Sequence, residues 1–136
     1  MQCLEWRREF LVGVQDVDAQ HQQLFAMLSA LYTAIERHAD EDDLLQTIDG
    51  LLVYLKEHFS REEALLRSHP RWDEHHRQHW RFTEKVLVFL REFKRRKGRG
   101  EHNSLALEIY DFLCGWLRAH IVEVDRRYFA ELRPSH

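Results

Sequence analysis

Apolar residues recur at intervals of three and four along four long stretches of this chain, and that period belongs to the α-helix. The spacing places the apolar side chains of each stretch on one stripe of a helix. Glycine and proline are scarce, and most of them separate the stretches, at Gly13, Pro70, Gly98, Gly100 and Pro134. Amphipathic helices joined by short connections predict an all-α fold, an antiparallel up-down-up-down four-helix bundle.

The breaks in the pattern predict helices over about residues 18–38, 42–67, 71–96 and 103–131. We expect Asp18 to cap the first helix, Pro70 to start the third, and Asn103 or Ser104 to cap the fourth. Residues 1–17 contain apolar side chains without a clean period. They are therefore expected to form an extended N-terminal arm laid over the bundle.

Length and composition predict a single domain over 1–136, because 136 residues are enough to bury a core without disulfides or a structural metal. A net charge of −3 argues against a nucleic-acid partner. Cys3 and Cys114 have no metal-ligand spacing, which favours a reducing, cytoplasmic location. The longest uncharged apolar runs, at 51–55 and 86–90, are too short to span a bilayer, and the N-terminus does not resemble a signal peptide. No feature identifies a protein partner.

Several of the ten histidines fall on stripes that should face the core. Residues four apart share a helix face, so HFSRE (58–62) presents an imidazole beside a carboxylate, and HHRQH (75–79) presents two imidazoles. Titratable residues on the apolar stripes of all four predicted helices are His21, His58, Glu62, His75, His79 and His120. Inward-facing imidazoles and carboxylates on facing helices build metal sites in bundles, and they suit iron, manganese or zinc.

Ordinary explanations exist for each of these residues taken singly. One core histidine is most often a hydrogen-bonded packing residue, and one histidine pair is often a solvated surface pair. These explanations fail jointly, because they require an accidental polar residue on every apolar stripe. They hold for the remaining histidines, which lie in loops, at an end or beside a stripe: His38, His69, His76, His102 and His136.

The chain resembles the hemerythrin family, and in particular the bacterial hemerythrins, over nearly its whole length. The residues that carry the resemblance are GVQDVDAQH (13–21), HFSREE (58–63), HPRWDEHHRQHWRF (69–82) and WLRAHIVEVD (116–125). The resemblance implies two Fe ions in an oxo- or hydroxo-bridged di-iron centre. The implied iron ligands are His21, His58, Glu62, His75, His79, His120 and Asp125. Glu62 and Asp125 would be the carboxylates that bridge the irons.

The last of these ligands departs from simple helical geometry. Asp125 lies five residues after His120, about 140° round an ideal helix. Periodicity alone favours Glu123, whereas the resemblance implies Asp125. We therefore expect a local widening of the helix, or a reaching side chain, to bring Asp125 to the site.

The implied ligand set leaves room for a small molecule. If each iron is six-coordinate, the histidines, the bridging carboxylates and one bridging oxo or hydroxo group fill every position but one. The resemblance implies reversible O2 binding at that position, with NO and small anions such as azide as further ligands. Their place beside the ligand motifs suggests Phe59, Trp116, Leu117 and Ile121 as an apolar wall of the O2 pocket, although ordinary core packing explains them equally well.

The predicted function is therefore O2 carriage, storage or delivery, and not enzymatic turnover. One alternative is a di-iron enzyme on the same scaffold, a peroxidase, an oxidase or a nitric-oxide-handling protein. No inward acid or tyrosine can be placed beside the open position, which argues against that alternative. Another is an O2 or redox sensor in which ligation moves the N-terminal arm or the basic loop at 94–103.

Overall fold

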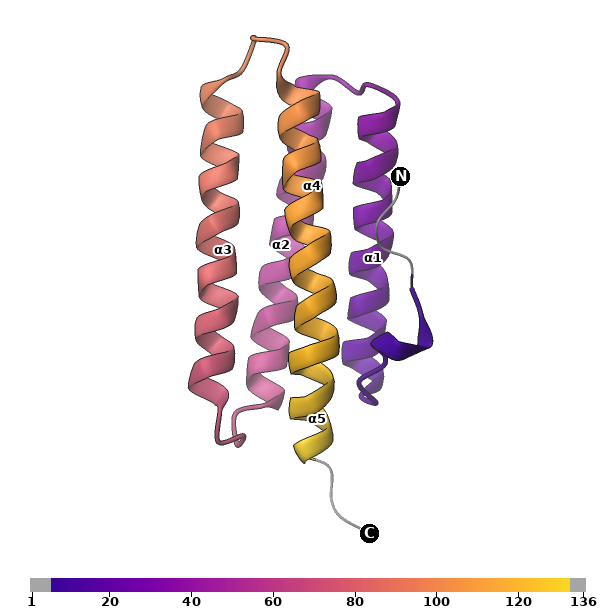
Figure 1. The fold of residues 1–136 in the computed structure, drawn as a ribbon, viewed down its shortest axis with the longest axis vertical. Helices are drawn as coiled ribbons and strands as arrows, with labels where there is room; N and C mark the ends of the chain where they lie inside the picture. Colours follow the sequence, from indigo (N-terminus) through magenta and orange to yellow (C-terminus); the bar gives the residue numbers. More distant parts are fainter. Residues whose placement is uncertain (1–5, 133–136) are drawn as a thin grey trace.

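The computed structural model describes residues 6–132 and confirms the four-helix bundle (Figure 1). Its elements are η1 (Arg8–Phe10), α1 (Gln15–Glu36), α2 (Glu41–Leu65), α3 (Trp72–Arg95), α4 (His102–Ala119), η2 (His120–Asp125) and α5 (Arg126–Leu132). The chain runs up, down, up and down, so the α1–α2 and α3–α4 connections share one end of the bundle and the α2–α3 connection and α5 share the other. No helix within residues 6–132 has both the length and the apolar character needed to cross a membrane.

The first helix begins earlier than predicted, and the prediction that Asp18 caps it is wrong. Helix α1 starts at Gln15, after Val14, which makes no side-chain cap. Asp18 lies inside the first turn, where its carboxylate accepts hydrogen bonds from the backbone N–H groups of Val12 at 2.7 Å and Gly13 at 3.2 Å. Gly13 has a φ of 85°, which favours glycine. Asp18 therefore fastens the preceding segment to α1.

The predicted arm is only partly extended. In the described part of it, η1 forms one short 3₁₀ turn, and the ring of Phe10 packs at 5.0 Å from that of Phe25 on α1. The ring of Trp6 lies 5.2 Å from Phe25. Cys3 and the rest of residues 1–5, together with 133–136, lie outside the described range.

Two further boundary predictions are wrong. Pro70 lies in the turn before α3, which starts at Trp72, because the chain first has to reverse direction there. Helix α4 starts at His102, so neither Asn103 nor Ser104 precedes it as a cap. The Asn103 amide instead donates to the backbone carbonyl of Ile35 at 3.2 Å, which ties α4 to the end of α1.

Apolar side chains fill most of the bundle interior. The larger cluster extends to the end that carries the α1–α2 and α3–α4 connections and takes residues from all four helices, among them Leu31, Ile48, Phe93 and Ile109. A smaller cluster at the opposite end consists of Val12, Val17, Leu66, Tyr128 and Phe129. The titratable residues on the helix stripes contact both clusters, through ring packing of Phe59 on His79 and of Tyr128 beside His75.

Candidate metal centre

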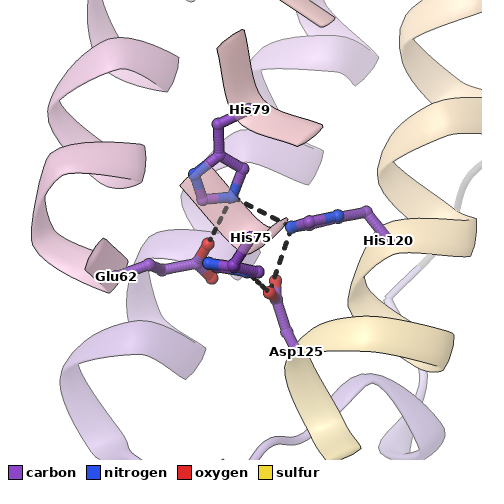
Figure 2. Close-up of side chains that lie close together, drawn as sticks. All are labelled: Glu62, His75, His79, His120 and Asp125. Atoms are coloured by element: carbon purple, nitrogen blue, oxygen red, sulfur yellow. Dashed lines mark hydrogen bonds and ion pairs between the residues drawn. The ribbon is translucent and has the colours of Figure 1, made fainter. Parts of the chain in front are cut away.

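The structure brings together every residue of the predicted ligand set. Each of these side chains is at most 4% exposed, and they come from α1, α2, α3 and η2. They form two groups in which the potential ligand atoms lie within 4.8 Å of one another. One group is Glu62, His75, His79, His120 and Asp125, and the other is His21, His58, Glu62 and Asp125. Figure 2 shows the first group, which we call the three-histidine group; the second is the two-histidine group.

Glu62 belongs to both groups and directs a different oxygen toward each. Its Oε2 atom lies 3.0 Å from Nε2 of His21 and 3.0 Å from Nε2 of His58. Its Oε1 atom lies 3.3 Å from Nε2 of His79. One carboxylate therefore faces two histidines of the two-histidine group and one histidine of the three-histidine group.

Asp125 has the same divided arrangement. Its Oδ1 atom lies 2.8 Å from Nε2 of His75 and 3.1 Å from Nε2 of His120 (Figure 2). Its Oδ2 atom lies 3.4 Å from Nε2 of His21. Two carboxylates thus link the two groups, and they come from different elements, Glu62 from α2 and Asp125 from the end of η2.

The geometry that brings Asp125 inward is a π-helical segment. Helix α4 widens at His120 into η2, which ends at Asp125, so the predicted local widening is confirmed. A π-turn has more residues than an α-turn, and five residues then separate side chains on nearly the same face. Glu123, which periodicity alone favours, is exposed to solvent.

The donor atoms fit metal cations better than they fit one another. All five histidines of the two groups turn Nε2 inward, and the Nε2 atoms of His79 and His120 face each other at 2.9 Å. Within residues 6–132, the buried atoms Glu62 Oε1 and Asp125 Oδ2 have no hydrogen-bond partner. A buried carboxylate oxygen without a partner is costly, and a cation between the inward nitrogens and these oxygens would satisfy it.

Without a metal, protons on histidines balance the two carboxylates. Burial lowers the pKa of His21, but the nearby carboxylates of Asp125 and Glu62 outweigh burial and raise the pKa to about 9. Burial likewise lowers the pKa of His79, but the nearby carboxylates of Glu62 and Glu63 outweigh burial and raise the pKa to about 9. Burial alone would raise the pKa of Glu62, yet the histidines around it hold that pKa well below its ordinary value. A metal bound here must displace these protons.

Two of the histidines also contact polar side chains through Nδ1, the ring nitrogen that faces away from the centre. His58 Nδ1 lies 2.8 Å from the side-chain oxygen of Gln20, and His79 Nδ1 lies 3.0 Å from Glu63 Oε2. The other oxygen of Glu63 bonds to Nδ1 of His76. Gln20 and Glu63 were not predicted as functional residues, since both lie beside the apolar stripes and periodicity selects only residues on them. Their adjacency to His21 and Glu62 in the sequence was the available signal.

Of the four predicted wall residues, two pack on histidines of the three-histidine group. The Phe59 ring stacks on that of His79 with centroids 3.9 Å apart, and the Trp116 ring stacks on that of His120 at 4.3 Å. Leu117 and Ile121 are buried in the large apolar cluster. The buried Tyr128 ring lies 5.4 Å from that of His75, in the three-histidine group.

His69, interpreted from the sequence as an ordinary residue, has structural contacts away from both groups. It is buried, its Nε2 lies 2.7 Å from Glu131 Oε2, and its Nδ1 accepts from the backbone N–H of Arg71 at 3.0 Å. Its ring stacks on Tyr128. His69 therefore joins the α2–α3 turn to α5.

Comparison with known proteins identifies the family of this chain. The model of the hemerythrin HHE cation binding domain matches residues 12–132. A bacteriohemerythrin of Clostridium acetobutylicum is 30% identical over 129 residues, which cover 90% of this chain and 96% of that protein. A bacteriohemerythrin of Stenotrophomonas maltophilia is 28% identical, covering 98% of this chain and 84% of that protein, and one of Pseudomonas aeruginosa is 27% identical, covering 99% and 85%. The chain therefore belongs to the hemerythrin family.

Proposed function

We propose that this protein binds O2 reversibly at a centre of two iron ions held inside the bundle. The observation that carries the proposal is the divided arrangement of Glu62 and Asp125, each of which directs one oxygen toward each histidine group. One cation in each group would share both carboxylates. The full proposed ligand set is His21, His58, Glu62, His75, His79, His120 and Asp125.

The two groups differ by one ligand, and this difference suggests where O2 binds. The three-histidine group offers three imidazoles and two carboxylates, whereas the two-histidine group offers two imidazoles and the same carboxylates. A metal in the two-histidine group would have one protein ligand fewer and would therefore keep an open position. O2 is proposed to bind on the side of His21 and His58.

The side chains around the centre suit ligand binding without turnover. A pair of irons would supply two electrons to bound O2 and take them back when O2 is released. His21, Glu62 and Asp125 are fully buried, so bulk water and its protons are kept from the centre. We assign the wall of the O2 pocket to Phe59, Trp116, Leu117 and Ile121. Phe59 and Trp116 would also hold the rings of His79 and His120 in place, because they stack on them.

The family relationship supports a metal centre here, because the matching domain is described as cation binding. Iron is favoured over calcium or magnesium by the imidazole-rich donor set. NO and azide are proposed as further ligands of the same open position, since they are small enough to reach it. Storage and delivery of O2 are the roles that a non-enzymatic binding site supports, and sensing would use the same site.

Metal analysis and absorption spectroscopy test this function together. The protein is loaded with ferrous iron without air, its iron content is measured, and its spectrum is recorded before air, after air and after O2 removal. We expect two irons per chain and charge-transfer bands that appear with air and disappear when O2 is removed. Fewer than two irons in the parent protein, or bands that persist after O2 removal, would contradict the proposal.

The same experiment separates a binding protein from an enzyme. In one portion of the air-exposed protein O2 is removed and the released O2 is measured; to another an electron-donating peroxidase substrate is added, and its oxidised product is followed. A binding protein releases O2 in proportion to the protein in the first portion and forms no product beyond a stoichiometric amount in the second. Multiple turnovers per chain would instead favour an enzyme, for which Tyr128 beside His75 would be the first residue to replace.

A further inference from the structure

Both carboxylate oxygens of Glu63 form hydrogen bonds with histidines of α3. Oε2 lies 3.0 Å from Nδ1 of His79, and Oε1 bonds to Nδ1 of His76. The side chain of Glu63 is 15% exposed and that of His76 is 48% exposed, so this chain of contacts runs from the centre to the surface. The residues line a surface pocket of about 270 Å³, which His79 and Trp80 also border.

The backbone and the neighbours of Glu63 hold it in this position. The indole N–H of Trp72 donates to the backbone carbonyl of Glu63 at 2.7 Å. The same indole ring stacks on His76, with centroids 5.1 Å apart and planes 6° from parallel. Trp72, His76 and Glu63 therefore form one interlocked unit between the start of α3 and the end of α2.

The contact with Glu63 determines which nitrogen of His79 carries a proton when a metal is bound. A carboxylate accepts hydrogen bonds and donates none, so Nδ1 of His79 must be the N–H donor. The inward Nε2 is then free to offer its lone pair to a cation. Nδ1 of His58 faces only the neutral oxygen of Gln20, and within residues 6–132 the Nδ1 atoms of His21 and His75 have no hydrogen-bond partner.

We infer that Glu63 is a positioning residue for the three-histidine group: it fixes the tautomer and the ring orientation of His79, and His76 in turn holds Glu63. The inference rests on the proposed metal centre, because its role is defined toward a metal ligand. A carboxylate behind a ligating imidazole also makes that imidazole a stronger donor. The negative charge of Glu63 therefore favours ferric over ferrous iron in this group.

The test measures how fast a chelator removes ferrous iron from the protein without air. Loss of such an outer partner typically costs about 10–100-fold in metal affinity, so Glu63→Ala should release iron faster by a factor of that order. Glu63→Gln should fall between Glu63→Ala and the parent, because its amide oxygen still accepts from His79. The control is Glu57→Ala, which removes an exposed acid from the same helix.

A second readout separates positioning from general support of the fold. The midpoint potential of the iron couple should rise in Glu63→Gln, since the charge that stabilises ferric iron is gone while the size of the side chain is kept. Release at the parent rate in Glu63→Ala would overturn the inference, as would an unchanged potential in Glu63→Gln. A parent protein that holds no iron would instead overturn the proposed function, so the two failures are distinguishable.

Discussion

The two halves of the bundle are built from the same four helices, yet their interiors differ in kind. Toward the α1–α2 and α3–α4 connections the interior is hydrocarbon, with Leu31, Ile35, Leu44, Ile48, Phe93, Leu105 and Ile109 buried. We call this region the apolar half. Toward the other end the two histidine groups occupy the interior together with the smaller apolar cluster, and we call that region the metal half. Burial in the apolar half is mainly of hydrocarbon and stabilises the fold, and within residues 6–132 its unpaired buried side-chain atoms are His102 Nδ1 and Asn103 Oδ1 at the start of α4. Burial in the metal half leaves atoms of the proposed ligands themselves unpaired.

This difference indicates that one part of the core stabilises the fold and another part provides the proposed metal site. Burying an aliphatic side chain contributes about 1.5–3 kcal/mol, whereas a buried polar atom without a partner costs about 1–3 kcal/mol. The metal half can therefore keep such atoms only because the apolar half offsets their cost. Substitutions in the two halves should consequently change different measurements.

The largest effect is expected from Glu62→Ala in the metal half. Both histidine groups would lose a shared carboxylate, and the buried positive charge of the metals would lack compensation. The variant should hold at least one iron fewer per chain than the parent. Iron content is measured after loading and gel filtration, with Glu57→Ala as the control for a lost acid on α2. Unchanged iron content would show that Glu62 does not bridge two metals.

The metal-free protein should lose stability as the pH rises. His21 and His79 have a pKa of about 9 in the fold, against 6.5 for an ordinary histidine, so their contribution is fully present below about pH 6.5 and is lost as the pH rises through 9. Urea unfolding of chelator-treated protein at several pH values measures this change. Iron-loaded protein should lack this dependence, because metal has displaced the protons. A flat profile for the metal-free protein would contradict the assigned protonation.

Leu31→Ala tests the apolar half. Leu31 is fully buried, and about ten residues of helix, roughly 15 Å, separate it from His21. The cavity should lower the free energy of unfolding by about 2–5 kcal/mol. Iron content and the rate of autoxidation should remain those of the parent. Loss of iron in a folded Leu31→Ala protein would show that the two halves are not independent.

The smallest and most specific effect is expected at the boundary between the halves, in Leu117→Ala. Leu117 is buried and precedes His120 by about one turn, and its removal should open a path for water to the proposed O2 site. The stability cost should resemble that of Leu31→Ala, so that variant is the matched control. Autoxidation should be faster in Leu117→Ala alone. Equal autoxidation rates in the two variants would place the pocket wall elsewhere.

The sequence predicted the elements that repeat and failed where a contact depends on tertiary context. Helical periodicity found four helices and placed the histidines inward, because both depend on spacing alone. Asp18 was misplaced, because an aspartate near a helix start can cap that helix or bind the preceding loop, and the local sequence is the same in both cases. Glu63 was missed because its partners, His76 and His79, come from another helix.

At the end of η2, helical periodicity and the resemblance to a known family predicted different acids. An ideal helix directs Glu123 closer to the face of His120, and periodicity therefore favoured the wrong acid for the buried position. The structure buries Asp125 and exposes Glu123, because η2 is π-helical. The length of a π segment cannot be obtained from a hydrophobic pattern, whereas the resemblance to the hemerythrin family implied the position of the acid directly.

The most direct test of the central claim is a crystal structure of the iron-loaded, reduced protein with anomalous scattering measured at the iron edge. The proposal predicts two iron peaks roughly 3.5–4 Å apart, with Glu62 and Asp125 each contacting both. One peak should be bound by His75, His79 and His120, and the other by His21 and His58. A single peak, or two peaks without a shared carboxylate, would contradict the di-iron centre on which the proposed function depends.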